Sequence, residues 1–177
     1  MEKRKWLVIN YNLPTEPSRH RVSTWRNLRK LGALNIQQSM WVLVDNEENH
    51  SALQDLSQYI ESNQGEVLLM ESVFFAAKHE EKVISLFTSM RNEEYTEYIH
   101  ECDKYFKELE KEISIEKYTF AELEEEEEEL QKLISWYQKI KARDVFNASE
   151  GNTAKERTEQ IKKAFEDYSE AVYKHNE

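Results

Sequence analysis

The chain has 177 residues, enough for one ordinary domain or for a small domain with a helical extension. Hydrophobic residues make up 39% and charged residues 33% of it, which provides a core and favours long, solvated helices. The N-terminus lacks a signal-like apolar run, no segment approaches the roughly 20 apolar residues of a membrane span, and Cys102 is the single cysteine. The sequence therefore predicts a cytoplasmic protein without disulfides, with no membrane as partner.

Charge is divided unevenly along the chain. Residues 1–45 carry eight Lys and Arg against three Asp and Glu, a net charge of +5, which leaves −16 for the rest of a chain whose net charge is −11. This division is typical of a basic binding face on an acidic body. It is equally consistent with two halves that neutralise each other by packing together.

The first 72 residues alternate between strand and helix patterns. In chain order the patterns predict a strand at 5–12, a helix at 19–31, strands at 33–38 and 40–45, a helix at 46–63 and a strand at 66–73. This βαββαβ order is that of the ferredoxin-like split βαβ fold. We therefore predict an α+β protein with a ferredoxin-like domain at residues 1–77.

Residues 78–177 have helical periodicity and predict an antiparallel helical bundle as an extension. The first helix is expected to break near Asn92, "TFAE" (119–122) opens a second helix to about Arg143, and "TAKE" (153–156) opens the last. Gly151 is expected in the loop before it. The six consecutive glutamates from Glu124 to Glu129 repel one another, so this run predicts a solvated helix face rather than a metal cluster.

No motif of high catalytic specificity is present. The chain has no Gly-rich phosphate loop, no His-x-x-x-His pair and no Gly-x-Ser-x-Gly elbow, and its five histidines are scattered. We therefore predict no catalytic residues, no metal site and no cofactor, and an enzyme is not the favoured reading.

The helix predicted at 19–31 is the best candidate binding site. Ser18 is a plausible N-cap that leaves the backbone N–H groups of Arg19 to Arg21 free to meet an anion. At 100° per residue, Arg19, Arg26 and Lys30 fall within a sector of about 40°. Packing against the sheet is assigned to Val22, Trp25, Leu28 and Leu31. The candidate anion or nucleic-acid site comprises Ser18, Arg19, Arg21, Arg26, Arg29 and Lys30; alternatively, these arginines pair with the acidic helical tail.

A secondary basic cluster lies near the end of the acidic helix. It consists of Lys139, Lys141 and Arg143. Cations suit a helix C-terminus electrostatically, so capping is the favoured explanation for these three residues.

Several segments resemble one protein family over nearly the whole chain. They are "WLVINYNLPTEPSRHRVSTWRNLRKLGALNIQQSMWVL", "MRNEEYTEYIHEC" (90–102), "KYTFAELEEEEEELQKLISWYQKIKARDVF" (117–146) and "AFEDYSEAVY" (164–173). They resemble the N-terminal domain of ChrB. The most specific parts of the resemblance are the run Leu-Pro-x-Glu-Pro-Ser-x-x-Arg-Val-x-x-Trp-Arg at residues 13–26 and the Arg-Asp pair at 143–144. The resemblance implies a chromate-responsive regulator of a chromate-efflux operon.

Residues 5–72 also resemble, more faintly, the small CRISPR adaptation proteins and the central domain of the PaaX repressors. Those are ferredoxin-like dimers that sit on nucleic acid. The nuclease members of the CRISPR family place a metal-binding Asp where "INYNLP" has Asn12. An amide supplies no charge for activating water, so metal-dependent cleavage is disfavoured.

The sequence thus predicts a non-enzymatic, homodimeric regulatory protein. Its partner would be DNA or a tetrahedral oxyanion such as chromate, bound through the basic helix. The alternatives are a dimerisation or partner-binding module without a ligand, and a divalent-metal nuclease that uses Asn12 with a nearby carboxylate such as Asp45.

Overall fold

The computed structural model describes residues 2–177, and this described part forms five helices and one four-stranded antiparallel sheet. The protein is therefore α+β, as predicted. The chain divides into two compact units, one that ends at Val83 and one from Ile84 to Glu177. Among the described residues, no helix combines the length and the apolar character needed to cross a bilayer.

The first unit contains the strands and two helices. Their bounds are β1 Trp6–Asn12, α1 Arg19–Leu31, β2 Leu34–Gln37, β3 Met40–Val44, α2 Glu47–Ser62 and β4 Glu66–Ser72. Each boundary lies within one residue of the predicted one. Gly32 ends α1 with a φ of 76°, a left-handed conformation that glycine adopts without strain, and its N–H donates to the Arg29 carbonyl at 3.0 Å.

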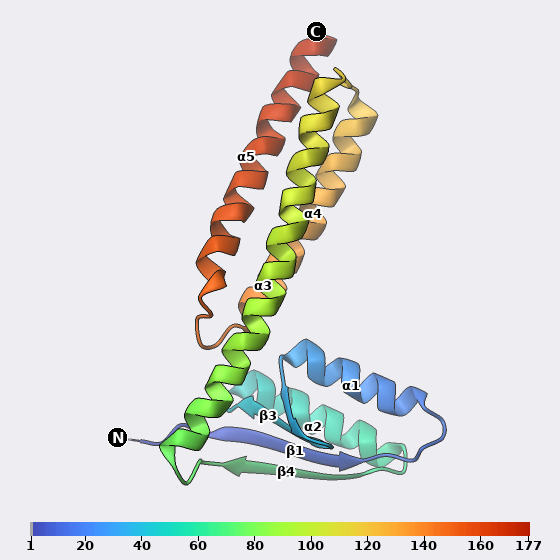
Figure 1. The fold of residues 1–177 in the computed structure, drawn as a ribbon. Helices are drawn as coiled ribbons and strands as arrows, with labels where there is room; N and C mark the ends of the chain where they lie inside the picture. The colour runs from blue at the N-terminus through green and yellow to red at the C-terminus, as the bar shows by residue number, and fades with distance from the viewer. Residues whose placement is uncertain (1) are drawn as a thin grey trace. The chain divides into compact units, whose positions relative to one another are not determined.

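The sheet has the strand order β2-β3-β1-β4, and every neighbouring pair is antiparallel. Helices α1 and α2 cover one face of it (Figure 1). Because side chains alternate along a strand, Leu7 and Ile9 of β1 point to the same face, where they pack with Leu28 of α1 and Ile60 of α2. This core fixes the inward side of α1, and with it the side that faces solvent.

The second unit is an antiparallel bundle (Figure 1). It is built from α3 (Ala77–Ser114), which begins in the first unit, α4 (Phe120–Arg143) and α5 (Glu150–Asn176). Thr119 caps α4, since its side-chain oxygen accepts from the Glu122 N–H at 3.2 Å. This confirms the start that "TFAE" predicted.

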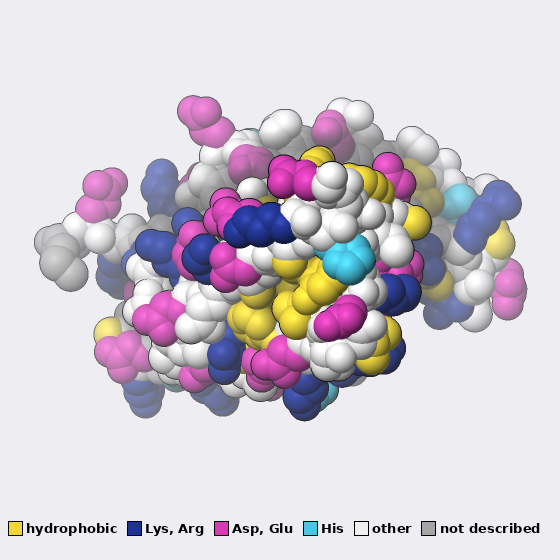
Figure 2. All heavy atoms as spheres, turned by 90° about the horizontal axis from the view of Figure 1, so that it is seen from above, with side chains coloured by type: hydrophobic (Ala, Val, Ile, Leu, Met, Phe, Trp, Pro, Cys, Tyr) yellow, Lys and Arg dark blue, Asp and Glu magenta, His cyan; other side chains and the backbone are white. Residues whose placement is uncertain are grey.

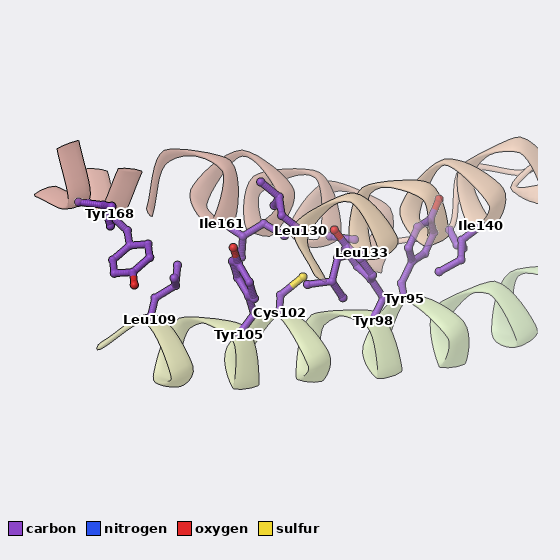
Figure 3. Packing of buried hydrophobic residues seen from close by; sticks show 13 residues of the cluster. Tyr95, Tyr98, Cys102, Tyr105, Leu109, Leu130, Leu133, Ile140, Ile161 and Tyr168 are labelled. Carbon is purple, nitrogen blue, oxygen red and sulfur yellow. The ribbon is translucent and has the colours of Figure 1, made fainter. Parts of the chain in front are cut away.

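Tyrosines of α3 line the bundle core beside Cys102 and face leucines and isoleucines of α4 and α5 (Figure 3). Each buried hydroxyl finds a partner: Tyr98 bonds the Thr158 hydroxyl at 2.7 Å, and Tyr105 donates to the Glu126 carbonyl at 3.0 Å. Cys102 is fully buried, and burial raises the pKa of its thiol. The core therefore combines apolar packing with hydrogen-bonded tyrosine hydroxyls.

Two predicted helix boundaries are wrong, and Asn92 is involved in both. Helix α3 does not break near Asn92; the Asn92 side-chain oxygen instead accepts from the Glu150 N–H at 2.9 Å. This contact starts α5 at Glu150, about one turn before the predicted "TAKE" start. Gly151 consequently lies in the helix and not in a loop, and a Cβ there would come within 3.3 Å of the Tyr95 ring.

The acidic run of α4 is also not wholly solvated. Glu126 is 3% exposed, because its position continues the inward stripe of Leu130 and Leu133. Glu129 is half-buried, and the other four members of the run are exposed. One of the six glutamates thus lies in the bundle rather than on its surface.

Hydrophobic side chains gather at the end of the bundle nearest the C-terminus (Figure 2). Ile115 between α3 and α4 is 57% exposed and Tyr173 of α5 is 56% exposed. The rings of Phe120 and Tyr173 meet edge-on, with centroids 5.3 Å apart. This surface is an exposed apolar patch of the second unit.

Candidate anion and nucleic-acid surface on helix α1

Helix α1 packs on the sheet through a face that differs from the predicted one. Thr24 and Leu28 are fully buried, and His20 and Leu31 are half-buried, so the inward residues follow mainly a spacing of four. Val22 and Trp25, which were expected to pack, are 41% and 48% exposed. The prediction of this face is wrong because a threonine and a histidine occupy positions where the pattern called for apolar side chains.

The outward face of α1 is basic. At 100° per residue, Arg19, Arg26, Arg29 and Lys30 fall within an arc of about 100° opposite Leu28, and all four are exposed. No carboxylate of residues 2–83 lies within 4.0 Å of any of them. Within the first unit, the charges of this face are therefore not neutralised and can meet an external anion.

Trp25 adds an aromatic ring to the basic face. The Arg29 guanidinium carbon lies 5.4 Å from the centroid of this ring, within the range of a cation–π contact. Together with Val22, the ring places apolar surface among the arginines. The basic face thus has an exposed aromatic ring beside its positive charges.

The N-terminal end of α1 has no side-chain cap. Ser18 precedes the helix as predicted, but its backbone is helical (φ −61°, ψ −21°) and its hydroxyl makes no capping bond. The first turn also contains no acidic residue. The Arg21 guanidinium donates to the Thr15 carbonyl at 2.9 Å, which ties it to the preceding loop. The first-turn N–H groups are thus left without a side-chain acceptor.

A hollow of about 190 Å³ lies beside this end of the helix. Its lining joins the proline loop and the start of α1 to the end of α2: Pro14, Glu16, Pro17, Arg19, His20, Ser62, Asn63 and Gln64. His20 is anchored by a 2.9 Å hydrogen bond between its Nδ1 and the Tyr59 hydroxyl. Sequence patterns alone did not indicate the part played by α2, since it depends on the tertiary packing.

The secondary basic cluster is not gathered into one site. Lys139 and Lys141 are exposed, and at two residues' separation they point to opposite sides of α4. Arg143 instead donates to Glu94 of α3 at 3.1 Å, and Glu94 also pairs with Arg91 at 3.2 Å. The neighbouring Asp144 accepts from the Ala148 N–H at 3.0 Å and from the Tyr95 hydroxyl at 3.1 Å. The Arg-Asp pair therefore joins the bundle helices.

The residues named for a nuclease lie at opposite ends of a strand. Asn12 is the last residue of β1, whereas the Asp45 N–H donates to the Lys5 carbonyl just before β1 begins. At the rise of an extended strand these ends are about 20 Å apart. Across residues 2–177, no three His, Cys, Asp or Glu side chains converge in a way that could hold a metal ion. Asn12 and Asp45 thus cannot share one ion.

These features define an α+β protein with an exposed basic helix on its sheet domain. A comparison with protein families matches residues 21–177 to the N-terminal domain of protein ChrB. The chain belongs to this ChrB N-terminal family. Neither a curated protein nor a solved structure matches the chain.

Proposed function

We propose that the chain is a regulatory protein of chromate resistance that binds the phosphate backbone of a nucleic acid through α1. The observation that carries the proposal is the outward face of the helix. Four cations share one arc, Trp25 lies exposed beside Arg29 at its edge, and the first unit supplies no carboxylate within 4.0 Å. Arginine and lysine contacts to phosphates dominate nucleic-acid affinity, and an exposed ring offers a stacking surface for bases. Membership of the ChrB family supports the regulatory role.

The ligand class follows from charge and not from a base-reading motif. Phosphate contacts position a nucleic acid without reading its sequence, so this face accounts for affinity and leaves specificity to other contacts. We further infer that the sheet domain is ferredoxin-like. The strand order β2-β3-β1-β4, with both helices on one face of the sheet, supports this inference.

A second candidate ligand is a tetrahedral oxyanion such as chromate. The uncapped start of α1, with Arg19 at the edge of its hollow, supports this alternative. The hollow also contains Glu16, whose carboxylate would repel an anion at close range. Nucleic-acid phosphate along the exposed face is therefore the better supported ligand.

The test is the salt dependence of duplex binding, measured by fluorescence anisotropy. Replacing all three of Arg19, Arg26 and Lys30 by Ala should weaken binding. It should also make the negative slope of log K against log salt shallower by about 3, since each phosphate contact contributes about 0.9 to its magnitude. The fold should survive, because all three side chains are exposed. Circular dichroism checks this.

A matched control removes the same charge from the bundle. Lys107, Lys155 and Lys174 are exposed lysines of α3 and α5, and their replacement by Ala should leave the slope nearly unchanged. Equal loss in both triple variants would refute a defined α1 site. Release of the duplex by chromate but not by sulfate at equal ionic strength would instead favour the oxyanion.

We further propose that the protein is a homodimer. The support comes from β4, an edge strand whose Leu68 is 65% and Met70 44% exposed. Unpaired backbone groups along such an edge can pair with another strand.

A further inference from the structure

The acidic part of the bundle contains a hollow that is separate from the proposed binding surface on α1. It measures about 460 Å³ and is lined by one residue of α3 and by the first half of α4: Glu108, Ala121, Glu124, Glu125, Glu126, Glu128, Glu129 and Lys132. Six of these side chains are carboxylates, against one lysine. Lys132 is already paired with Glu129 at 3.2 Å. The hollow therefore carries a strong excess of negative charge.

Glu126 distinguishes this hollow from a solvated acidic face. The residue is 3% exposed, and its buried Oε2 atom has no hydrogen-bond partner. The Tyr105 hydroxyl donates only to the Glu126 backbone carbonyl, not to the side chain. A buried carboxylate oxygen without a donor is costly, and because Glu126 also lines the hollow, a cation bound there would stabilise its ionised form.

The layout of the carboxylates favours an organic cation over a metal ion. Within residues 2–177 no three carboxylate, imidazole or thiol groups converge on one point. Glu125 and Glu129 are instead one turn apart along α4, about 6 Å at the helical rise. Spaced negative charges match a ligand whose ammonium groups are separated by short methylene chains.

We propose that this hollow binds a polyamine, with one ammonium group donating to Glu126 and Glu108 and another reaching the exposed glutamates of α4. The alkyl segments would lie along Ala121 and the methylene groups of the glutamates. This site is independent of the proposed nucleic-acid surface.

The charged surroundings of Glu126 predict how binding depends on pH. Burial, and then Glu108 of α3, raise the pKa of Glu126 to about 7, with Glu122, Glu112 and Glu125 adding to the effect. The groups facing it are Tyr105, Glu108 and Glu112 from α3, Glu122, Glu125 and Glu129 from α4, Tyr168 from α5, and Lys117, which pairs with Glu112 and Glu122. A cation prefers the ionised carboxylate, so binding should tighten as the pH rises from 6 to 8.

The experiment is isothermal titration of the full chain with spermidine at pH 8 and pH 6. We expect binding at pH 8, weakening at pH 6, and a loss of about tenfold or more in Glu126→Gln and in Glu108→Gln, as for removal of a charge-assisted hydrogen bond. Glu126→Gln should also lose the pH dependence. Because Glu108 is exposed, its variant tests the site without risk to the core.

Glu127→Gln is the matched control, since it removes the same charge from the same run but does not line the hollow. Its spermidine affinity should change less than about twofold. The proposal is overturned if Glu127→Gln weakens binding as much as Glu126→Gln does, which would mean diffuse attraction. It is equally overturned if spermidine does not bind, or if magnesium displaces it at equal concentration.

Discussion

Glu126 shows how one ionisable residue can set the pH response of a helical bundle. It occupies a core position of α4, and its ionised form is opposed by burial and by neighbouring carboxylates, which raise its pKa from 4.5 to about 7. The folded protein therefore holds a proton on Glu126 at pH values where the unfolded chain releases it. Stability from this group is complete below about pH 4.5 and is lost as the pH rises through about 7.

We expect the free energy of unfolding to fall by about 2.5 kcal/mol between pH 5 and pH 8 through Glu126 alone, since each pKa unit corresponds to about 1.4 kcal/mol. Glu126→Gln should flatten this part of the profile and be the more stable protein at pH 8. Urea unfolding followed by circular dichroism measures both. The exposed Glu127→Gln variant should keep the wild-type profile, and a Glu126→Gln profile as steep as the wild type would contradict the assignment.

Single residues also mark the limit of prediction from sequence. The end of α1 at Leu31 and the start of α4 after Thr119 were predicted correctly because their causes are local: the left-handed Gly32 and the Thr119 cap. Trp25 and Glu126 were misplaced because their burial depends on which face of the helix meets a neighbour. An amphipathic pattern with polar members on the inward face, such as His20 and Thr24, does not reveal that face by periodicity alone.

At the scale of elements, the start of α5 depends on a residue of α3. Asn92 is remote from Glu150 in sequence, yet its side-chain oxygen accepts the Glu150 N–H and the Ser149 hydroxyl lies 3.4 Å from the same atom. The local "TAKE" pattern offered a competing start at Thr153 that the protein does not use. Helix boundaries fixed by tertiary contacts of this kind are beyond the reach of local sequence rules.

We predict that Asn92→Ala lowers the free energy of unfolding by about 1 kcal/mol, the usual cost of losing a side-chain acceptor at a helix start. The first turn of α5 should then fray back toward Thr153. Hydrogen exchange of the backbone amides at residues 150–153 would report this fraying. Asn152→Ala, an exposed change within the same turn, should alter stability by less than about 0.5 kcal/mol.

The βαββαβ part of the chain was predictable for a different reason. Its strands are short apolar runs bounded by glycine, proline and polar residues, so each boundary could be read within one residue. The hollow at the start of α1 could not be predicted, because Ser62, Asn63 and Gln64 reach it only through the packing of α2. The basic residues of the candidate surface were named from sequence, whereas their aromatic neighbour Trp25 was placed in the core.

At the scale of the whole molecule, charge is segregated by segment. The net charge of residues 1–45 is +5 against −16 for the rest, so repulsion by the acidic part opposes the approach of a nucleic acid to α1. A second basic helix would help to overcome this repulsion, because each additional phosphate contact adds to the affinity for the nucleic acid. Dimerisation is therefore a functional expectation as well as a structural one.

The edge strand β4 is self-complementary. An antiparallel copy centred on Leu69 would set Leu68 against Met70 in both directions and Glu66 against Ser72, so like charges would not face each other. We therefore expect the wild-type chain to be a dimer by light scattering coupled to size-exclusion chromatography. Leu68→Lys should make it a monomer, since lysine on a sheet edge prevents pairing.

The same substitution links assembly to binding. A Leu68→Lys monomer should show about half the wild-type slope of log K against log salt on a duplex that accommodates two copies of α1, since half of the phosphate contacts are lost. Ile115→Lys serves as the control, because Ile115 belongs to the apolar patch at the end of the bundle and is similarly exposed. If Ile115→Lys dissociates the dimer and Leu68→Lys does not, the interface lies at the bundle end. In that case β4 is not the contact that brings two basic helices to one nucleic acid.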